Sequence, residues 1–343
     1  MNLMAKFRHA LVAVTAATAL VLTGCSNAEN GTSANSSANN TASSSEAVTA
    51  TSVTVEDNYS EKTIELPIER VVSLDNRTFE VLDEWGVKLE AAPRKLVPHS
   101  IPGIKDDDSI VDIGNHREPN LEAIVAADPQ VIVSGQCFTK YDDQIEEMNP
   151  QATLVEFEPR DGEPLDQELK RQVTALGKIF DKEDEAKKIV EDFDAALKRA
   201  KEAYDGQSTV MAVNVSGGEI GYIAPSIGRT YGPLFDLLNL KPALEVEGAS
   251  SDHKGDDISV EAIADSNPDF LMVLDRDAGT SAGDAPDFKP AESVIKESAL
   301  LQNVKAVKDG KVYIAPADTY TNESILTYTE ILNDLADQFE AAK

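Results

Sequence analysis

Two cysteines carry the most distinctive chemistry in this sequence, and Cys25 follows a short apolar run. The first 24 residues combine a positive start at Lys6 and Arg8, an apolar stretch from Leu11 to Leu22 and then small residues, which is the pattern of a secretory signal peptide. Leu22-Thr-Gly-Cys25 matches the motif at which a signal peptidase cuts before a diacylglycerol-modified cysteine. We expect residues 1–24 to be removed and the chain to be anchored through Cys25, because the apolar run is too short to span a bilayer.

Residues 25–52 are predicted to form a flexible tether, since Ser, Asn, Thr, Ala and Gly dominate and few large apolar residues could repay ordering. The second cysteine, Cys137, has no partner for a disulfide framework or a thiolate cluster. We expect it to be packed as a small hydrophobe. The 61 acidic and 31 basic residues give a formal net charge of −30, which argues against nucleic acid or anionic headgroups as partners.

Histidine is scarce, so metal and acid–base chemistry have few candidates. His9 leaves with the signal, and His99, His116 and His253 are scattered, which disfavours a bare Zn or Mn site. His253 lies in an acidic loop with Asp252 and Asp256, but no Gly-x-Ser-x-Gly elbow and no nucleotide-binding P-loop accompany it. We therefore expect no enzymatic activity.

Arginine offers a different chemistry, the recognition of adjacent anionic oxygens by a rigid fork of donors. Arg276 follows an apolar run that ends near Leu274, the edge of a parallel sheet at which ligands bind. Arg229 lies in a segment flanked by Gly and Pro, and Arg117 precedes an amphipathic stretch. A surface ion pair is the alternative role for each of these arginines.

An internal repeat indicates how these residues are positioned. Asn120 to Val133 matches Ser259 to Met272 at an offset of 139 residues, each copy reading as a short amphipathic helix, a break before proline and a buried strand. A weaker echo pairs residues 71–88 with residues 210–241, again a strand followed by a helix. The alternation predicts an α/β fold with two similar lobes and parallel-rich sheets.

One long helix is predicted between the lobes, because apolar residues recur at three- and four-residue steps from about Glu183 to Tyr204 and Gly206 follows. The expected organisation is an N-terminal lobe over 53–182, a connecting helix over 183–206 and a C-terminal lobe over 207–343. A single stiff connection leaves a cleft between the lobes, which is a preferred place for a ligand.

Several stretches resemble the petrobactin- and catecholate-binding branch of the solute-binding lipoproteins of iron-siderophore importers, within the helical-backbone periplasmic-binding-protein superfamily. They are Gly217 to Tyr222, Arg229 to Asp236, Asp269 to Arg276 and Asn303 to Tyr313. The similarity extends over nearly all of residues 53 to 343. Its individual motifs are loose, but their order and spacing together are specific.

The resemblance implies roles for particular residues. It places ligand-binding arginines at Arg229 and Arg276, and an iron-completing histidine and tyrosine at His253 and Tyr320. Tyr222 and Arg117 are further candidates for ligand binding. The third arginine of the branch is replaced in Ser134-Gly-Gln136, so Gln136 takes its place and the pocket carries less positive charge.

The function implied is capture of a ferric siderophore, of catecholate or mixed type, at the outer face of the cell membrane. Delivery to an ABC permease with a cytoplasmic ATPase would follow. We expect a monomer with no permanently bound cofactor, since Fe(III) arrives in its siderophore and prefers anionic oxygen donors. Haem or cobalamin binding remains the alternative, because the same architecture serves it and fold alone does not decide.

Overall fold

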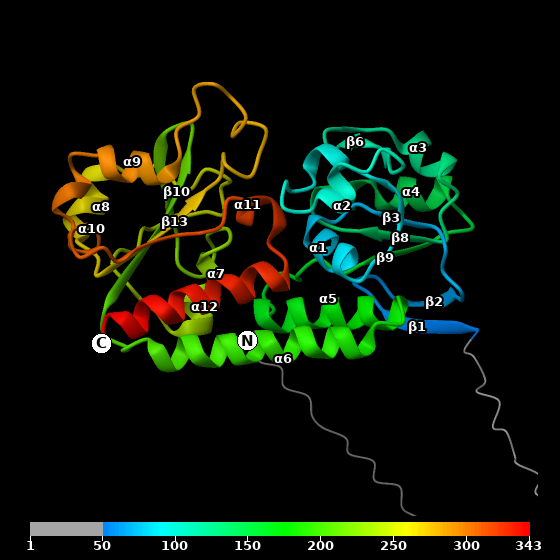
Figure 1. The fold of residues 1–343 in the computed structure, drawn as a ribbon, viewed down its shortest axis with the longest axis horizontal. Helices are drawn as coiled ribbons and strands as arrows, with labels where there is room; N and C mark the ends of the chain where they lie inside the picture. The colour runs from blue at the N-terminus through cyan, green and yellow to red at the C-terminus, as the bar shows by residue number, and fades with distance from the viewer. Residues whose placement is uncertain (1–50) are drawn as a thin grey trace, which may run out of the picture. The chain divides into compact units, whose positions relative to one another are not determined.

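Two five-stranded sheets form the two halves of residues 51–343, the part of the chain that the computed structural model describes (Figure 1). The predicted signal, Cys25 and nearly all of the predicted tether lie outside the described residues. The α/β fold class with parallel-rich sheets is confirmed.

The first sheet has the order β5-β4-β3-β8-β9, and all its neighbouring strands are parallel. Its central strands consist of Val, Ile and Ser that are buried on both faces, as expected of a parallel sheet covered by helices. The strands are β3 (Val71–Ser73), β4 (Leu89–Ala92), β5 (Val111–Asp112), β8 (Val131–Ser134) and β9 (Thr153–Glu156).

Helices and two antiparallel hairpins surround this sheet. The hairpins are β1 (Ser52–Glu56) with β2 (Glu61–Glu65), and β6 (Gly114–Asn115) with β7 (Glu118–Pro119). The helices are α1 (Asn76–Glu84), η1 (Arg94–Leu96), α2 (Pro102–Lys105), α3 (Leu121–Ala126), η2 (Gln136–Tyr141) and α4 (Asp142–Met148).

The second sheet has the order β11-β10-β13-β14, with β12 also pairing with β10. Only the β10–β11 pair is antiparallel. The strands are β10 (Thr209–Ser216), β11 (Glu219–Ile223), β12 (Lys241–Pro242), β13 (Phe270–Asp275) and β14 (Val312–Ile314). The helices around it are α7 (Gly232–Leu238), α8 (Val260–Ser266), α9 (Ala291–Glu297), η3 (Leu301–Asn303), α10 (Lys305–Lys308) and α11 (Thr319–Asn322).

The internal repeat is confirmed as a shared helix–strand unit, α3 with β8 and α8 with β13. The side chains of Asn120 and Ser259 cap the two helices, because each accepts a hydrogen bond from the backbone amide three residues later, Ala123 and Ala262. Asp128 and Asn267 each have a φ of 45° just before the proline, so both helices end in the same left-handed turn.

Three long helices form the layer that joins the two halves. The predicted connecting helix is confirmed as α6 (Glu183–Ala203), which begins with three acidic residues and buries its apolar face. It packs against α5 (Leu165–Ile179) and, along its C-terminal part, against α12 (Ile325–Ala341), as Figure 1 shows. The connection is therefore thicker than the single helix that the periodicity predicts. The domain boundaries themselves stay a prediction.

The largest hydrophobic cluster runs through this helical layer. It includes Val133 of the first sheet, Phe193 of α6 and Met272 of the second sheet, all essentially buried. If one half slid past the other, apolar surface would be exposed to water at a free-energy cost of about 25 cal/mol per Å². The layer therefore resists large motions of the two halves. Within residues 51–343, no helix is long and apolar enough to cross a membrane.

Candidate functional site

A cavity of about 250 Å³ lies between the two halves and is lined by residues of both. Six of the predicted site residues line it, namely Arg117, Gln136, Arg229, His253, Arg276 and Tyr320. The first two come from the N-terminal half and the other four from the C-terminal half. The structure thus brings together residues that are up to 203 positions apart in the chain, from Arg117 to Tyr320.

The ring of Tyr320, which α11 carries, lies against two guanidinium groups. The guanidinium carbon of Arg229 is 4.5 Å from the ring centre and that of Arg276 is 5.0 Å from it. Cations at these distances are attracted by the electrons of an aromatic face. The contacts hold both arginines beside the cavity without using up all of their hydrogen-bond donors.

His253 is held in a defined protonation state by its neighbours. Its Nδ1 lies 2.6 Å from Nη1 of Arg229 and 2.9 Å from the hydroxyl oxygen of Tyr320. Because a guanidinium only donates, Nδ1 must accept, which places the proton of the neutral ring on Nε2. Burial, together with the charges of Arg229 and Arg276, lowers the pKa of His253. The imidazole is therefore neutral at pH 7 and has an unprotonated nitrogen facing Tyr320.

The loop that carries His253 is fixed to the second sheet through its backbone. The carbonyl of His253 accepts from Nδ2 of Asn214 at 2.8 Å, and Asp256 exchanges two backbone hydrogen bonds with Tyr222 of β11. A Cβ at Gly221 would lie 2.1 Å from the carbonyl oxygen of Lys254, so glycine is required for this close approach. The sequence around β11 thus positions the histidine.

Tyr222 is the predicted site residue that the structure places elsewhere. Its side chain is 1% exposed, packs in the core of the C-terminal half and donates its hydroxyl to the carbonyl of Leu244 at 2.7 Å. The strand pleat turns it away from the cavity. Its prediction as a ligand-binding side chain is wrong, and what it supplies to the site is the backbone that holds the loop of His253.

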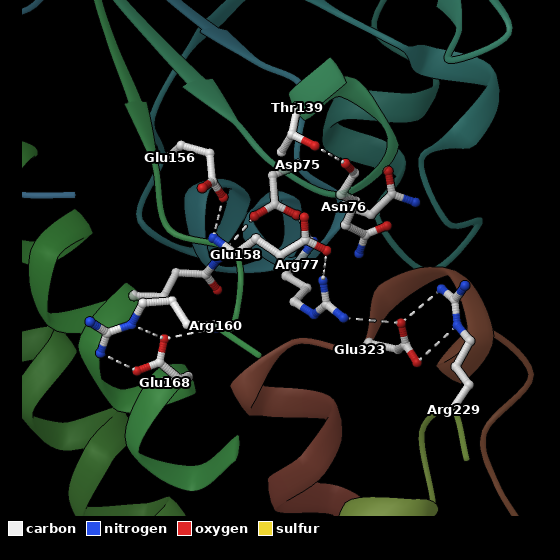
Figure 2. A network of polar contacts seen from close by, with 12 residues as sticks. Asp75, Asn76, Arg77, Thr139, Glu156, Glu158, Arg160, Glu168, Arg229 and Glu323 are labelled. Atoms are coloured by element: carbon white, nitrogen blue, oxygen red, sulfur yellow. Dashed lines mark hydrogen bonds and ion pairs between the residues drawn. The ribbon is translucent and has the colours of Figure 1, made fainter. Parts of the chain in front are cut away.

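Arg229 is anchored by an ion pair with Glu323, as Figure 2 shows. The Glu323 carboxylate accepts from Nη2 of Arg229 at 2.8 Å and from Nε at 3.3 Å, and also from the hydroxyl of Thr230. On its other side it lies 3.5 Å from Nη2 of Arg77 in α1 of the N-terminal half. Burial opposes ionisation of Glu323, but the two arginines outweigh it and keep its pKa below the usual range. A shared buried carboxylate thus links the site to both halves.

Arg276 follows β13 directly and also has a carboxylate partner. Its Nη1 donates to Asp277 at 3.1 Å and to the hydroxyl of Ser216 at 3.3 Å. Its Nε is buried and has no hydrogen-bond partner among the described residues. An unpaired buried donor is costly, so a ligand oxygen that reached this nitrogen would be stabilised.

The N-terminal wall of the cavity begins where β8 ends. A Cβ at Gly135 would lie 2.5 Å from the carboxyl carbon of Asp75, so the chain can pass only with glycine. Gln136 then has a φ of 49°, and its buried Nε2 is another donor without a partner in the described chain. Cys137 is exposed and lines the cavity, so its prediction as a packed residue is wrong.

Arg117 and His116 complete this wall from the turn between β6 and β7. Arg117 is exposed, and no ion pair of its guanidinium is found within residues 51–343. The backbone carbonyl of His116 accepts from the hydroxyl of Tyr141 at 3.1 Å. Burial, followed by the charges of Lys140, Arg117 and His253, lowers the pKa of His116.

His116 and Asn76 are site residues that the sequence reasoning did not select. Asn76 follows β3 and donates to the carbonyl of Thr321 at 2.8 Å across the two halves. The rule that predicted Arg276, a polar residue just after a buried strand, also applies to Asn76. Within the described residues no group of three or more His, Cys, Asp or Glu side chains is placed to hold a metal ion.

The fold and the cavity between its halves are those of a solute-binding protein, and comparison with known sequences agrees. A family model described as periplasmic binding protein matches residues 71–319, so the chain belongs to this family. The chain is 29% identical over 294 residues to the ferric-anguibactin-binding protein FatB of Vibrio anguillarum, covering 85% of this chain and 88% of FatB. It is 28% identical to the petrobactin-binding protein YclQ of Bacillus subtilis, covering 79% and 83% of the two chains.

A solved structure with the same fold is that of the siderophore-binding protein BauB, bound to a complex of two acinetobactin molecules and ferric iron. Its TM-score is 0.72 with 27% identity, and the match covers 84% of this chain and 98% of that one. These relatives are named as binding proteins rather than enzymes.

Proposed function

We propose that this protein captures a ferric siderophore outside the cytoplasm and delivers it to an ABC importer, while held at the membrane surface by lipid on Cys25. The names of the relatives support the ligand class. The sequence motif at Cys25 supports the anchor, and the family supports the role in transport.

The observation that carries the proposal is the convergence of two guanidinium groups, an imidazole and a phenol on one cavity. Ferric catecholate complexes are anionic and present pairs of adjacent oxygens. Burying such an anion is favourable only if cationic donors replace its water, and the fork of Arg matches adjacent oxygens. Nε of Arg276 and Nε2 of Gln136, which have no hydrogen-bond partner among the described residues, would donate to oxygens of the same anion.

Direct iron ligation by His253 and Tyr320 is the finer part of the proposal. Neighbouring donors of a six-coordinate metal with bonds of about 2.0–2.2 Å lie about 2.9 Å apart. The Tyr320 oxygen and the His253 Nδ1 are 2.9 Å apart, which suits two adjacent positions on iron. A tetradentate siderophore leaves two such positions open, so this pair would complete its iron shell.

Haem or cobalamin binding, the alternative from the sequence, is not favoured. The relatives concern ferric siderophores, and the arginine-rich lining suits a ligand with anionic oxygens around its metal.

Quenching of Trp85, the single tryptophan, is the direct test. Trp85 is buried at the end of α1, the helix whose first residue Asn76 lines the cavity. Titration with a panel of ferric siderophores should give saturable quenching, and haem should give no shifted Soret band. Saturable haem binding with no response to any ferric siderophore would overturn the proposal.

A further inference from the structure

The positive charge of the cavity is smaller than its arginines suggest, because carboxylates are built in behind them. Arg229 and Arg276 are the cations that contact Tyr320. Each has its own acidic partner, Glu323 for Arg229 and Asp277 for Arg276, and neither acid lines the cavity.

Glu323 is the more deeply placed of the two acids. Its side chain is 2% exposed, and it receives hydrogen bonds from Arg229, Thr230 and Arg77. Arg77 is a second guanidinium behind the site, and it also lies 3.6 Å from Glu158 (Figure 2). The buried cations of this network are therefore balanced by acids before any ligand arrives.

Asp277 holds Arg276 in the same way at the edge of the second sheet. Its side chain is 12% exposed and accepts from Ser216 at 3.2 Å and from the amide of Gly217. These bonds fix the carboxylate beside the guanidinium, so Arg276 does not face a ligand as an unbalanced charge.

The remaining lining adds little charge. Gln136 is neutral, and Nδ1 of His253 faces Nη1 of Arg229 at 2.6 Å, so this nitrogen accepts and carries no proton. Burial lowers the pKa of His116. Among the cavity-lining residues that the structure describes, Arg117 is the one arginine for which no carboxylate partner is found. The lining is thus rich in hydrogen-bond donors and carries little net positive charge.

We infer that this site selects ferric complexes of low negative charge over highly charged ones, and that Glu323 and Asp277 set this selectivity. The inference rests on the proposed function and names the class of siderophore within it. Two catecholates leave Fe(III) with a single net negative charge, whereas three leave it with a triple charge. A triply charged complex loses far more hydration on burial, and this lining returns too little Coulomb energy to replace it.

The test separates charge from shape by changing the metal. Tris-catecholate complexes of Fe(III) and Ti(IV) have the same ligand and similar geometry, but the titanium complex carries one negative charge fewer. We expect the wild type to bind a ferric bis-catecholate most tightly, the titanium tris-catecholate less tightly and the ferric tris-catecholate least, as measured by tryptophan quenching.

Three variants should change this order. Asp277→Asn keeps one acceptor oxygen, which the amide of Gly217 can use, but removes the charge, and should improve ferric tris-catecholate binding about tenfold relative to the bis-catecholate. Gln136→Arg should act in the same direction by adding a cation. Glu323→Gln should do so too if it folds, and Asp277→Asn keeps the test valid if it does not. Glu297→Gln in α9 removes an exposed acid outside the cavity and is the matched control.

Equal or tighter binding of the ferric tris-catecholate than of its titanium analogue would overturn the inference. So would a shift in Asp277→Asn and Gln136→Arg no larger than that in Glu297→Gln. Absence of binding by every complex, whatever its charge, would instead overturn the proposed function.

Discussion

The Tyr320 hydroxyl and Nη1 of Arg229 meet at the same nitrogen, Nδ1 of His253, at 2.9 and 2.6 Å. One nitrogen lone pair cannot accept from both groups at full strength and also bind a metal. If iron takes this nitrogen, Arg229 must release it, and its Nη1 becomes available to an oxygen of the siderophore. Glu323 would keep the rest of the guanidinium in place during this exchange.

Replacing both candidate ligands should distinguish iron ligation from recognition of shape. His253→Ala combined with Tyr320→Phe should weaken tetradentate ferric complexes far more than hexadentate ones, because a hexadentate siderophore leaves no position on iron open. The tyrosinate-to-iron absorption that accompanies tetradentate binding should disappear as well. Equal losses for the two classes of siderophore would leave only the arginine pocket.

Much of the fold could be predicted because it depends on local patterns. The repeat at 120–133 and 259–272 predicts two equivalent helix–strand units, and the periodicity near Phe193 predicts α6. The partner helix of α6 could not be predicted in this way. Packing of α12 against α6 joins segments more than 120 residues apart, and nothing local in either helix specifies its partner.

The candidate site was predictable where a rule about strand ends applies, as for Arg276 and Gln136. Glu323 illustrates what such rules miss. In sequence a glutamate is typical of an exposed surface, and here it is buried because Arg77, 246 positions away, and Arg229 meet it. Tyr222 illustrates the opposite error, since the motif is right but the pleat of β11 turns the side chain into the core.

Removal of a cavity arginine should weaken binding of ferric catecholates. Arg276→Ala and Arg229→Ala should each cost about 1.5–3 kcal/mol, or roughly 10- to 150-fold, the worth of a hydrogen bond to a charged group. Arg229→Ala should also lower stability, because Glu323 would keep only Arg77 nearby. Arg199→Ala, which breaks a surface pair with Glu340, is the control and should bind normally. Unchanged affinity in both cavity variants would place the ligand elsewhere.

A substitution in β11 should displace His253 without touching the cavity. In Gly221→Ala the new Cβ would lie 2.1 Å from the carbonyl oxygen of Lys254, so the loop must move, and stability should fall by about 1–3 kcal/mol. Tetradentate complexes should then bind as weakly as they do to His253→Ala, measured by tryptophan quenching. Gly218→Ala in the same hairpin is the control. Gly218 has a φ of 77°, but no atom lies within 4 Å of the position that a Cβ would take, so this variant adds backbone strain alone and should keep its affinity for tetradentate complexes. Similar affinities for the two glycine variants would show that the loop is not set by this contact.

The proposed anchor predicts a simple change of location. Cys25→Ser should prevent lipidation and release the protein from membranes, while purified material keeps its ligand affinity because the cavity lies in other residues. Fractionation followed by salt washing measures this, with Cys137→Ser as the control for loss of a thiol. A Cys25→Ser protein that stays on washed membranes would contradict lipid anchoring.

Stability should increase as the pH falls from 8 to 6.5, because of Glu156. Burial raises the pKa of this carboxyl from 4.5 to about 7, despite hydrogen bonds from the amide of Glu158 and from Asn58. Between those two values the folded state holds a proton that the unfolded state has lost, so folding is favoured at lower pH. His116 and His253 have lowered pKa values and act in the opposite sense only below about pH 6.5.

The free energy of unfolding of the wild type should therefore be larger at pH 6.5 than at pH 8, by up to about 1 kcal/mol in urea titrations. Asp75 and Asp142, whose burial raises each pKa to about 6, should extend the trend to lower pH. Glu156→Gln cannot titrate, so its stability should vary less over this interval. Lowering the pH also reduces the net negative charge of the protein, and this affects the wild type and Glu156→Gln alike. The informative quantity is therefore the difference between their free energies of unfolding at each pH. Parallel pH profiles for the wild type and Glu156→Gln would show that another group is responsible.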